Sequence, residues 1–287
     1  DFNRQKLIPY QISDRGPATA IGDINNDGKT DIFFGGSKFF PSRIFIQTDS
    51  LYVEESIPEI YRDSIKEDVA AVIADFTSNG KSDLFLGSGG ADFYNKMAPL
   101  LDSYYVQNDS VFETAVLPEY FENASVIKVN DFDNDGDPDI FVGNQAVSND
   151  FGKIPLSYLL KNDNGKFTIE NNEGLQNAGM ITDALWDDFD GDGVKDLIVV
   201  GEWMSPKFFA NINGVLVEKK SLDKEINGLW QSITVFDIDL DGDKDYLLGN
   251  WGINNKFRAS EDFPLKMFYS DFDGNGSTET IVVIPKN

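Results

Sequence analysis

A run of alternating aspartates fills the stretch DFDNDGDPDIFVGN, which begins at Asp131 and places five aspartates and one glycine in nine positions. Carboxylates held a few ångströms apart raise one another's pKa and destabilise the loop that holds them, so a cation is expected among them. Asp131, Asp133 and Asp135 alternate, a glycine at the sixth position allows a sharp bend, and Asp139 adds a carboxylate at the ninth. Calcium suits such a loop because it accepts about six to eight oxygen ligands in irregular geometry. The spacing therefore predicts a calcium loop, and an Asx-rich surface turn is the alternative.

The same nine-residue frame recurs along the chain, which argues against chance. Its six copies begin at Asp23, Asp75, Asp131, Asp188, Asp237 and Asp271. An EF-hand loop would need a bidentate Glu at its twelfth position and a helix on either side, but the twelfth position is apolar in every copy. A short apolar run that reaches a glycine follows each of the first five copies, and this pattern indicates a buried strand.

Composition excludes several classes of function. The formal net charge is -25, from 24 Lys and Arg against 49 Asp and Glu, so nucleic acid is not an expected partner. The sequence contains neither histidine nor cysteine, which removes the commonest general base, the usual zinc ligands and thiolate chemistry. No apolar stretch approaches the ~20 residues that a membrane-spanning helix needs.

Four strand-like segments surround each loop, and the third repeat contains all four: SVIKVNDF, DIFVG, PLSYLLKND and GKFTIEN. Four short strands in about 50 residues are typical of a propeller blade. The sixth loop starts only 34 residues after the fifth, so we expect it in the hairpin between the third and fourth strands of the fifth repeat. Residues 1–6 fit the register of a fourth strand whose own blade is missing.

The predicted fold is therefore an all-β propeller of four-stranded antiparallel blades, in a single domain over residues 1–287. It has about five blades plus the N-terminal strand, which either closes the ring or belongs to a larger ring of about six or seven blades. A β-sandwich is the rival fold, but a sandwich does not explain a loop that recurs with the period of the strands.

These residues resemble the FG-GAP/VCBS repeat family, the calcium-binding blades of integrin α-subunits and of many secreted bacterial proteins. By that likeness, the side chains at positions one, three, five and nine bind calcium, and position seven provides its backbone carbonyl. The implied ligand positions are Asp23, Asn25, Asp27, Lys29 and Asp31; Asp131, Asp133, Asp135, Asp137 and Asp139; Asp188, Asp190, Asp192, Val194 and Asp196; Asp237, Asp239, Asp241, Asp243 and Asp245; Asp271, Asp273, Asn275, Ser277 and Glu279. The second loop departs from the pattern and gives a weak set: Asp75, Thr77, Asn79, Lys81 and Asp83.

The rim opposite these loops carries the long connections, where binding residues concentrate on rigid scaffolds. Aromatic and amide side chains with one arginine in these connections suit a protein or glycan ligand. The candidate ligand-binding residues are Trp203, Trp251, Tyr94, Asn144, Asn254 and Arg258. The alternative is that both tryptophans pack between blades.

The resemblance does not fix one function, because the family includes adhesion receptors, surface-anchored bacterial proteins and a few polysaccharide lyases. We expect a calcium-binding, noncatalytic adhesion or ligand-binding module that is extracellular, at the cell surface or periplasmic. The absence of histidine favours this hypothesis over an enzyme. The alternative is a calcium-dependent polysaccharide lyase or hydrolase, which would need Tyr, Lys or Glu as its base.

Overall fold

The computed structural model describes residues 10, 15–109, 111–219, 222–257, 260, 262–276 and 278–283. The first sheet contains β1 (Thr19–Gly22), β2 (Asp31–Phe34), β3 (Arg43–Gln47) and β4 (Tyr52–Glu55). The second contains β5 (Asp68–Ala74), β6 (Asp83–Ser88), β7 (Ser103–Asn108) and β8 (Val111–Ala115), and the third contains β9 (Asn123–Asn130), β10 (Asp139–Ala146), β11 (Tyr158–Asp163) and β12 (Lys166–Glu170). All three are antiparallel, and their strands follow sequence order.

The fourth repeat forms β13 (Met180–Asp187), β14 (Asp196–Met204), β15 (Lys207–Ile212) and β16 (Val215–Lys219). The fifth begins with β17 (Gly228–Phe236) and β18 (Asp245–Asn250), and β17 also pairs with the end of β14. The last hairpin is β19 (Lys266–Ser270) and β20 (Glu279–Val283). Helices are short: α1 (Pro58–Arg62), α2 (Glu173–Gln176) and the 3-10 turn η2 (Ala98–Leu100). Within the described residues, no helix is long and apolar enough to cross a membrane.

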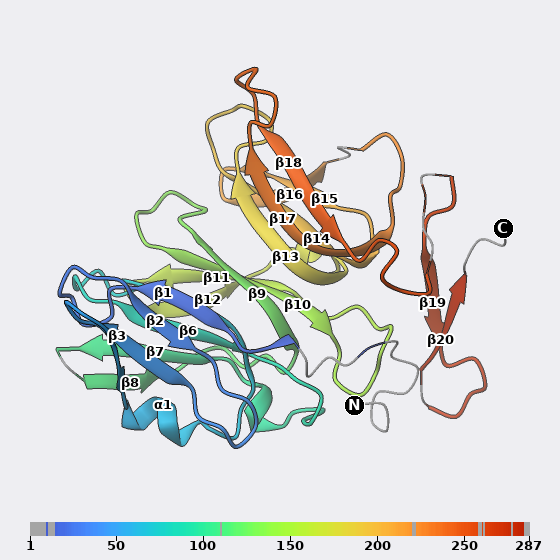
Figure 1. The fold of residues 1–287 in the computed structure, drawn as a ribbon. Coiled ribbons are helices and arrows are strands. Elements are labelled where there is room, and N and C mark those ends of the chain that lie inside the picture. The colour runs from blue at the N-terminus through green and yellow to red at the C-terminus, as the bar shows by residue number, and fades with distance from the viewer. Residues whose placement is uncertain are drawn as a thin grey trace.

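The sheets stack face to face, and their first strands lie in order. β1 packs against β5, β5 against β9, β9 against β13, and β13 against β17 (Figure 1). Small residues in the first and second strands allow this close approach. A Cβ added at Gly87 of β6, for example, would lie 2.8 Å from the Cβ of Ala124 on β9.

The second strands β6, β10 and β14 are buried on both faces, because their alternate side chains pack in two different cores. Ile140 and Val142 of β10 pack in the cluster shared with the second sheet, whereas Phe141 packs in the cluster shared with the fourth. On β14, Val199 likewise faces the third sheet and Val200 faces β17. This two-sided burial explains why these strands are continuous apolar runs rather than alternating ones.

The structure places the loops as predicted. The first five aspartate-rich loops join the first and second strands of their repeats, and the sixth joins β19 to β20. The predicted N-terminal strand at residues 1–6 lies outside the described residues. The sheets are antiparallel and mostly four-stranded. Among the described residues, no strand of the first sheet pairs with the last sheets, so a closed ring is not seen.

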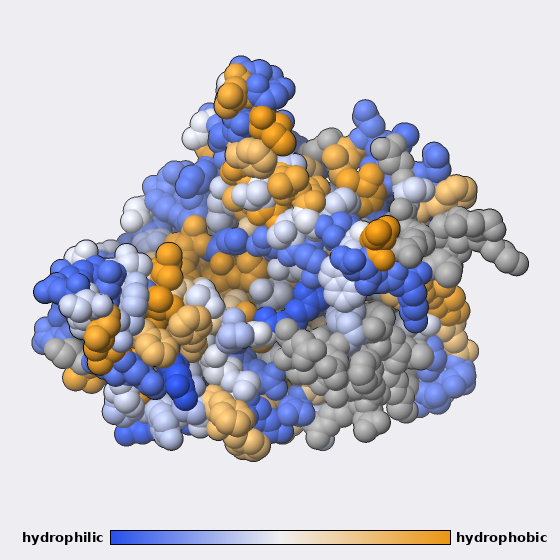
Figure 2. Space-filling view, in the orientation of Figure 1, coloured by the Kyte–Doolittle hydropathy of each residue, from blue (hydrophilic) through white to orange (hydrophobic). Residues whose placement is uncertain are grey.

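The fifth repeat does not form the complete blade that the sequence predicts. In the described part of the chain, β19 and β20 pair only with each other and not with β18. The connection after β18 crosses the start of β17, where Leu265 N donates to Asn227 O (3.2 Å) and Leu265 packs against Leu229. This crossing separates β19 from β18. Apolar surface is visible in the upper part of Figure 2, where Figure 1 places β17 and β18. Leu247 of β18 is 55% exposed.

Candidate functional site: opposite rims of the stacked sheets

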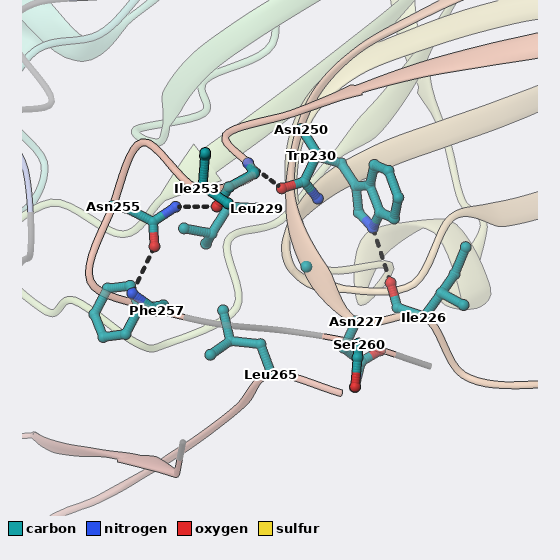
Figure 3. A pocket seen from close by; sticks show the side chains of 12 residues that line it. Ile226, Asn227, Leu229, Trp230, Asn250, Ile253, Asn255, Phe257, Ser260 and Leu265 are labelled. Carbon is teal, nitrogen blue, oxygen red and sulfur yellow. Dashed lines mark hydrogen bonds between the residues drawn. The ribbon is translucent and has the colours of Figure 1, made fainter. Parts of the chain in front are cut away.

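A cavity of about 450 Å³ lies where β17 begins and β18 ends, at the rim opposite the fifth aspartate-rich loop. Figure 3 shows its side chains, which come from the start of β17, the connection after β18 and the segment before β19. Apolar walls are provided by Leu229, Trp230, Phe257 and Leu265. This size and lining are typical of pockets that take small ligands or single side chains.

Amide side chains complete the pocket and also hold its loop. Asn250 Oδ1 accepts the N–H of Gly252 (2.9 Å), and Asn255 Oδ1 accepts the N–H of Phe257 (2.6 Å). Trp230 Nε1 donates to Ile226 O (3.0 Å), which fixes the indole against the wall. Sequence reasoning did not single out Trp230, because a tryptophan inside a strand has the pattern of a core residue. The long connection after β18, with its neighbouring asparagines Asn254 and Asn255, was the available signal.

The predicted tryptophans lie beside this pocket rather than in its lining. Trp203 and Trp251 are half-buried and pack against the apolar cluster that includes Leu229 and Phe257. The Trp203 and Phe257 ring centroids are 5.1 Å apart, and Trp203 Nε1 is buried without a hydrogen-bond partner. The ring centroids of Trp251 and Tyr10 are also close together, 5.2 Å apart.

The other predicted ligand-binding residues differ in how much of each side chain is exposed to solvent. Tyr94 is 38% exposed and Asn254 is exposed. Asn144 is 1% exposed, and its Nδ2 donates to Leu156 O (2.6 Å). Arg258 lies outside the described residues.

On the opposite rim, hydrogen bonds from backbone N–H groups shape the aspartate-rich loops. In the third loop, the N–H groups of Asp135 and Gly136 donate to the Asp131 carboxylate at 3.1 and 3.0 Å. Gly136 has φ of 99°, a backbone conformation that favours glycine. The first carboxylate therefore lies inside the curl of the loop.

The ninth-position carboxylate joins each of the first four loops to its sheet. In each of these loops, one oxygen accepts the N–H of position two and the other accepts an N–H of the third strand at 2.8 Å. The residues are Asp31, Asp83, Asp139 and Asp196, and all four are buried. Burial raises the pKa of Asp139 to about 7, and Asp133 and Asp135 add to the rise. A bound cation would oppose this shift by favouring the charged form.

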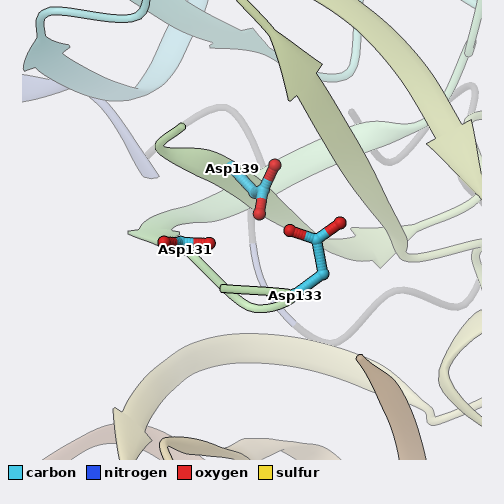
Figure 4. Close-up of side chains that lie close together, drawn as sticks. All are labelled: Asp131, Asp133 and Asp139. Atoms are coloured by element: carbon cyan, nitrogen blue, oxygen red, sulfur yellow. The ribbon is translucent and has the colours of Figure 1, made fainter. Parts of the chain in front are cut away.

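Four loops bring three carboxylates together, with one oxygen from each within 4.8 Å of the others. The groups are Asp131, Asp133 and Asp139; Asp188, Asp190 and Asp196; Asp237, Asp239 and Asp245; and Asp271, Asp273 and Glu279. Figure 4 shows the first group, which converges from both ends of its loop. Donor sets made only of oxygen atoms fit a hard cation such as calcium and not zinc or copper.

The fifth and seventh positions lie outside these groups. Asp135 pairs with Lys161 at 3.1 Å, Asp192 accepts the N–H of Val194, and Asp241 accepts that of Asp243. Asp137 accepts the N–H of Asn164 (3.0 Å). In the sixth loop, Asn275 N donates to both Asp271 and Asp273. Ser277 is outside the described residues.

The first two loops do not form such groups in the described structure. Lys29 Nζ lies 3.9 Å from Asp27 Oδ2 in the first loop, and Asn25 Nδ2 donates to the same Asp27 carboxylate. The second loop has the same backbone curl with fewer charges: Asn79 and Gly80 donate to Asp75. Thr77 Oγ1 is buried there without a hydrogen-bond partner, and Lys81 N donates to Asn79 Oδ1.

Comparisons with known proteins agree with the repeats. The model of the FG-GAP-like repeat matches residues 131–199 and 188–248. A search of curated proteins finds no match. Among solved structures, the V. cholerae biofilm matrix protein Bap1 is 16% identical over 94% of this chain, with a TM-score of 0.45. A proposed exo-beta-1,3-galactanase from Bifidobacterium bifidum s17 is 11% identical over 94% of this chain and 88% of its own, with a TM-score of 0.40.

The chain spans 37% of the length of Bap1, and both structural scores are too low to carry an argument about function. The repeat match instead covers the third, fourth and fifth loops, where carboxylate groups converge. Residues 131–248 of this chain are therefore similar to FG-GAP-like repeats.

Proposed function

We propose that the protein is a calcium-binding β-propeller that acts as a noncatalytic ligand-binding or adhesion module, outside the cell or in the periplasm. The observation that carries this proposal is the recurrence of the carboxylate groups in four loops. Each group is formed by oxygen donors alone and is anchored to the backbone of its loop. Extracellular calcium-binding modules have dissociation constants of about 10⁻⁴ to 10⁻³ M, so weak sites are sufficient for this role.

The propeller arrangement is supported by the packing of the first strands. Each of them contacts the first strand of the next repeat, as expected around a common axis. In this arrangement, β17 and β18 are the inner half of a fifth blade, and the hairpin β19–β20 is its displaced outer half. The aspartate-rich loops between first and second strands then share one rim.

The ligand is proposed to bind at the other rim, in the pocket beside Trp230. Among its described lining residues there are aromatic, aliphatic and amide side chains but no carboxylate. Such a lining supports recognition of a glycan or of a partner protein's side chain rather than hydrolysis. Trp203, Trp251, Tyr94, Asn254 and Arg258 remain proposed contributors to the same rim, whereas Asn144 is buried with its amide bonded to Leu156 O and is not expected to contact a ligand.

The calcium proposal is tested by melting curves in calcium and in chelator. Calcium at 100 times its dissociation constant should add ~2.7 kcal/mol to the free energy of unfolding. Asp190→Ala, at the third position of the fourth loop, should reduce the calcium-dependent rise in Tm. Thr77→Ala, at the same position of the second loop, is the matched control and should leave that rise unchanged. Identical curves with calcium and chelator would rule out the proposal.

The ligand proposal is tested on arrays of glycans and of extracellular matrix proteins. Trp230→Ala should abolish capture of whichever ligand the wild-type protein binds, because the pocket loses a wall. The control is Leu247→Ala, which removes an exposed apolar side chain (55% exposed) from β18, outside the pocket lining. Equal capture by wild type and Trp230→Ala would place the ligand site elsewhere. A calcium-dependent Tm shift that persists in both variants verifies that they are folded.

A second function, a calcium-dependent polysaccharide lyase or hydrolase, is favoured by one polar cluster. Burial raises the pKa of Glu202 to about 8, and its carboxylate accepts hydrogen bonds from Tyr10, Arg15 (2.6 Å) and Gln231 (2.8 Å). A buried carboxyl group beside tyrosine and arginine is suited to proton transfer. Calcium-dependent depolymerisation of anionic polysaccharides that is lost in Glu202→Gln would favour this function over the module.

A further inference from the structure

The Lys161 side chain places a positive charge next to the third aspartate-rich loop. It lies on β11, and its Nζ contacts Asp133 Oδ2 and lies 3.1 Å from Asp135 Oδ2. Asp133 also belongs to the carboxylate group with Asp131 and Asp139. The Lys161 ammonium is therefore ion-paired with Asp133, one of the carboxylates on which the proposed calcium site depends.

The strand register shows that the third loop is unlike its neighbours in this respect. Leu160 pairs with Ile140 in the third sheet, and Phe209 pairs with Leu197 in the fourth, so Lys161 corresponds to Ala210. The N–H groups of the next residues confirm this register, since each lies 2.8 Å from the ninth-position Asp of its loop. By the same pairings, the equivalent residues in the first and second sheets are Ile46 and Val106. Among these four sheets, the third alone places a lysine opposite its loop.

We propose that Lys161 is a built-in counter-ion of the third loop, so that calcium binds there by exchange with its ammonium and more weakly than at the fourth loop. The inference rests on the proposed calcium function. Two physical effects act in the same direction. The ion pairs with Asp133 and Asp135 must break, and a cation remains close to the bound divalent ion. The Lys161 side chain is 36% exposed, so it has room to swing into solvent on its flexible stem.

The two loops have matched reporters for a site-resolved test. Gly136 N donates to Asp131 Oδ2 (3.0 Å), and Gly193 N donates to Asp188 Oδ2 (2.9 Å). Calcium bound by these aspartates should shift the amide resonances of both glycines. A calcium titration followed by NMR therefore reads the third and fourth loops separately in one sample of the full chain.

In the wild-type protein, the Gly193 resonance should shift at lower calcium than the Gly136 resonance. Lys161→Met keeps most of the side-chain volume and removes the charge, so it should lower the Gly136 midpoint by roughly tenfold and leave Gly193 unchanged. Lys161→Arg keeps the charge and should retain the wild-type midpoint for Gly136.

The outcomes separate this inference from the function on which it rests. If neither glycine responds to calcium, the calcium function itself fails. If both respond but Lys161→Met leaves the Gly136 midpoint where it was, Lys161 is an ordinary surface ion pair and the counter-ion role is wrong. A shift of both midpoints in Lys161→Met would also overturn it, because the effect would then not be local to the third loop.

Discussion

At the scale of single residues, the carboxylates of the aspartate-rich loops differ in which backbone N–H groups donate hydrogen bonds to them. Those at the first position of each loop accept hydrogen bonds from backbone N–H groups within the loop, as Asp188 does from Asp192 and Gly193. In the first four loops, those at the ninth position also accept an N–H of the third strand, as Asp196 does from Asn211. The loops are thus shaped by the chain alone, and a cation would add its binding energy to a site that is already arranged.

A carboxyl away from the loops gives a pH-dependent prediction. Burial raises the pKa of Asp102 from 3.8 to about 6, although Asp102 accepts hydrogen bonds from Tyr158 and from Ser88 N. Lys66 is the charged group nearby, and it partly offsets the rise. Because the folded pKa lies above the unfolded value, the folded state binds more protons between pH 4 and 6, and this contribution to stability is lost as pH rises through that window.

Asp102→Asn should therefore remove part of the pH dependence of unfolding. Relative to wild type, the variant should gain up to roughly 3 kcal/mol in free energy of unfolding between pH 4 and pH 7. Urea denaturation of both proteins at several pH values measures this difference. A difference that stays constant with pH would show that Asp102 is ionised in the folded protein throughout.

At the scale of elements, the second strands differ in how completely they are enclosed. β10 is buried along its whole length and has a hydrogen-bonded strand on each side. β18 is at the edge of its sheet in the described structure, and none of its residues is buried. Strands with few buried contacts open at lower free energy than enclosed ones.

Amide hydrogen exchange should follow this difference. The amides of β10 and β14 should exchange through global unfolding, whereas those of β18 and β20 should exchange much faster through local opening. Mass spectrometry of peptides from each strand reads this directly. Equal protection of β10 and β18 would mean that another element covers β18 in solution.

At the scale of the whole molecule, the period of the aspartate frame was enough to predict the strand order and the position of all six loops. It also predicted that the sixth loop, at Asp271, lies in a late hairpin. It could not predict that this hairpin separates from β18, because that depends on how Leu265 packs against Leu229 and Phe257 across a long connection. Burial of Asn144, whose Nδ2 donates to Leu156 O, and the pocket wall at Trp230 likewise depend on the conformation of long connections, which the repeat pattern does not contain.

Because the side chains of β10 pack in two different cores, the length of this strand is constrained during evolution. Ile140 faces one neighbour and Phe141 the other, so deletion of a single residue between Asp139 and Gly143 would exchange the two faces and disrupt both cores. Insertions in the connections carry no such penalty. Lineages related to this protein should therefore differ by the duplication or loss of whole repeats and by loop length, while the number of residues in each second strand stays nearly fixed.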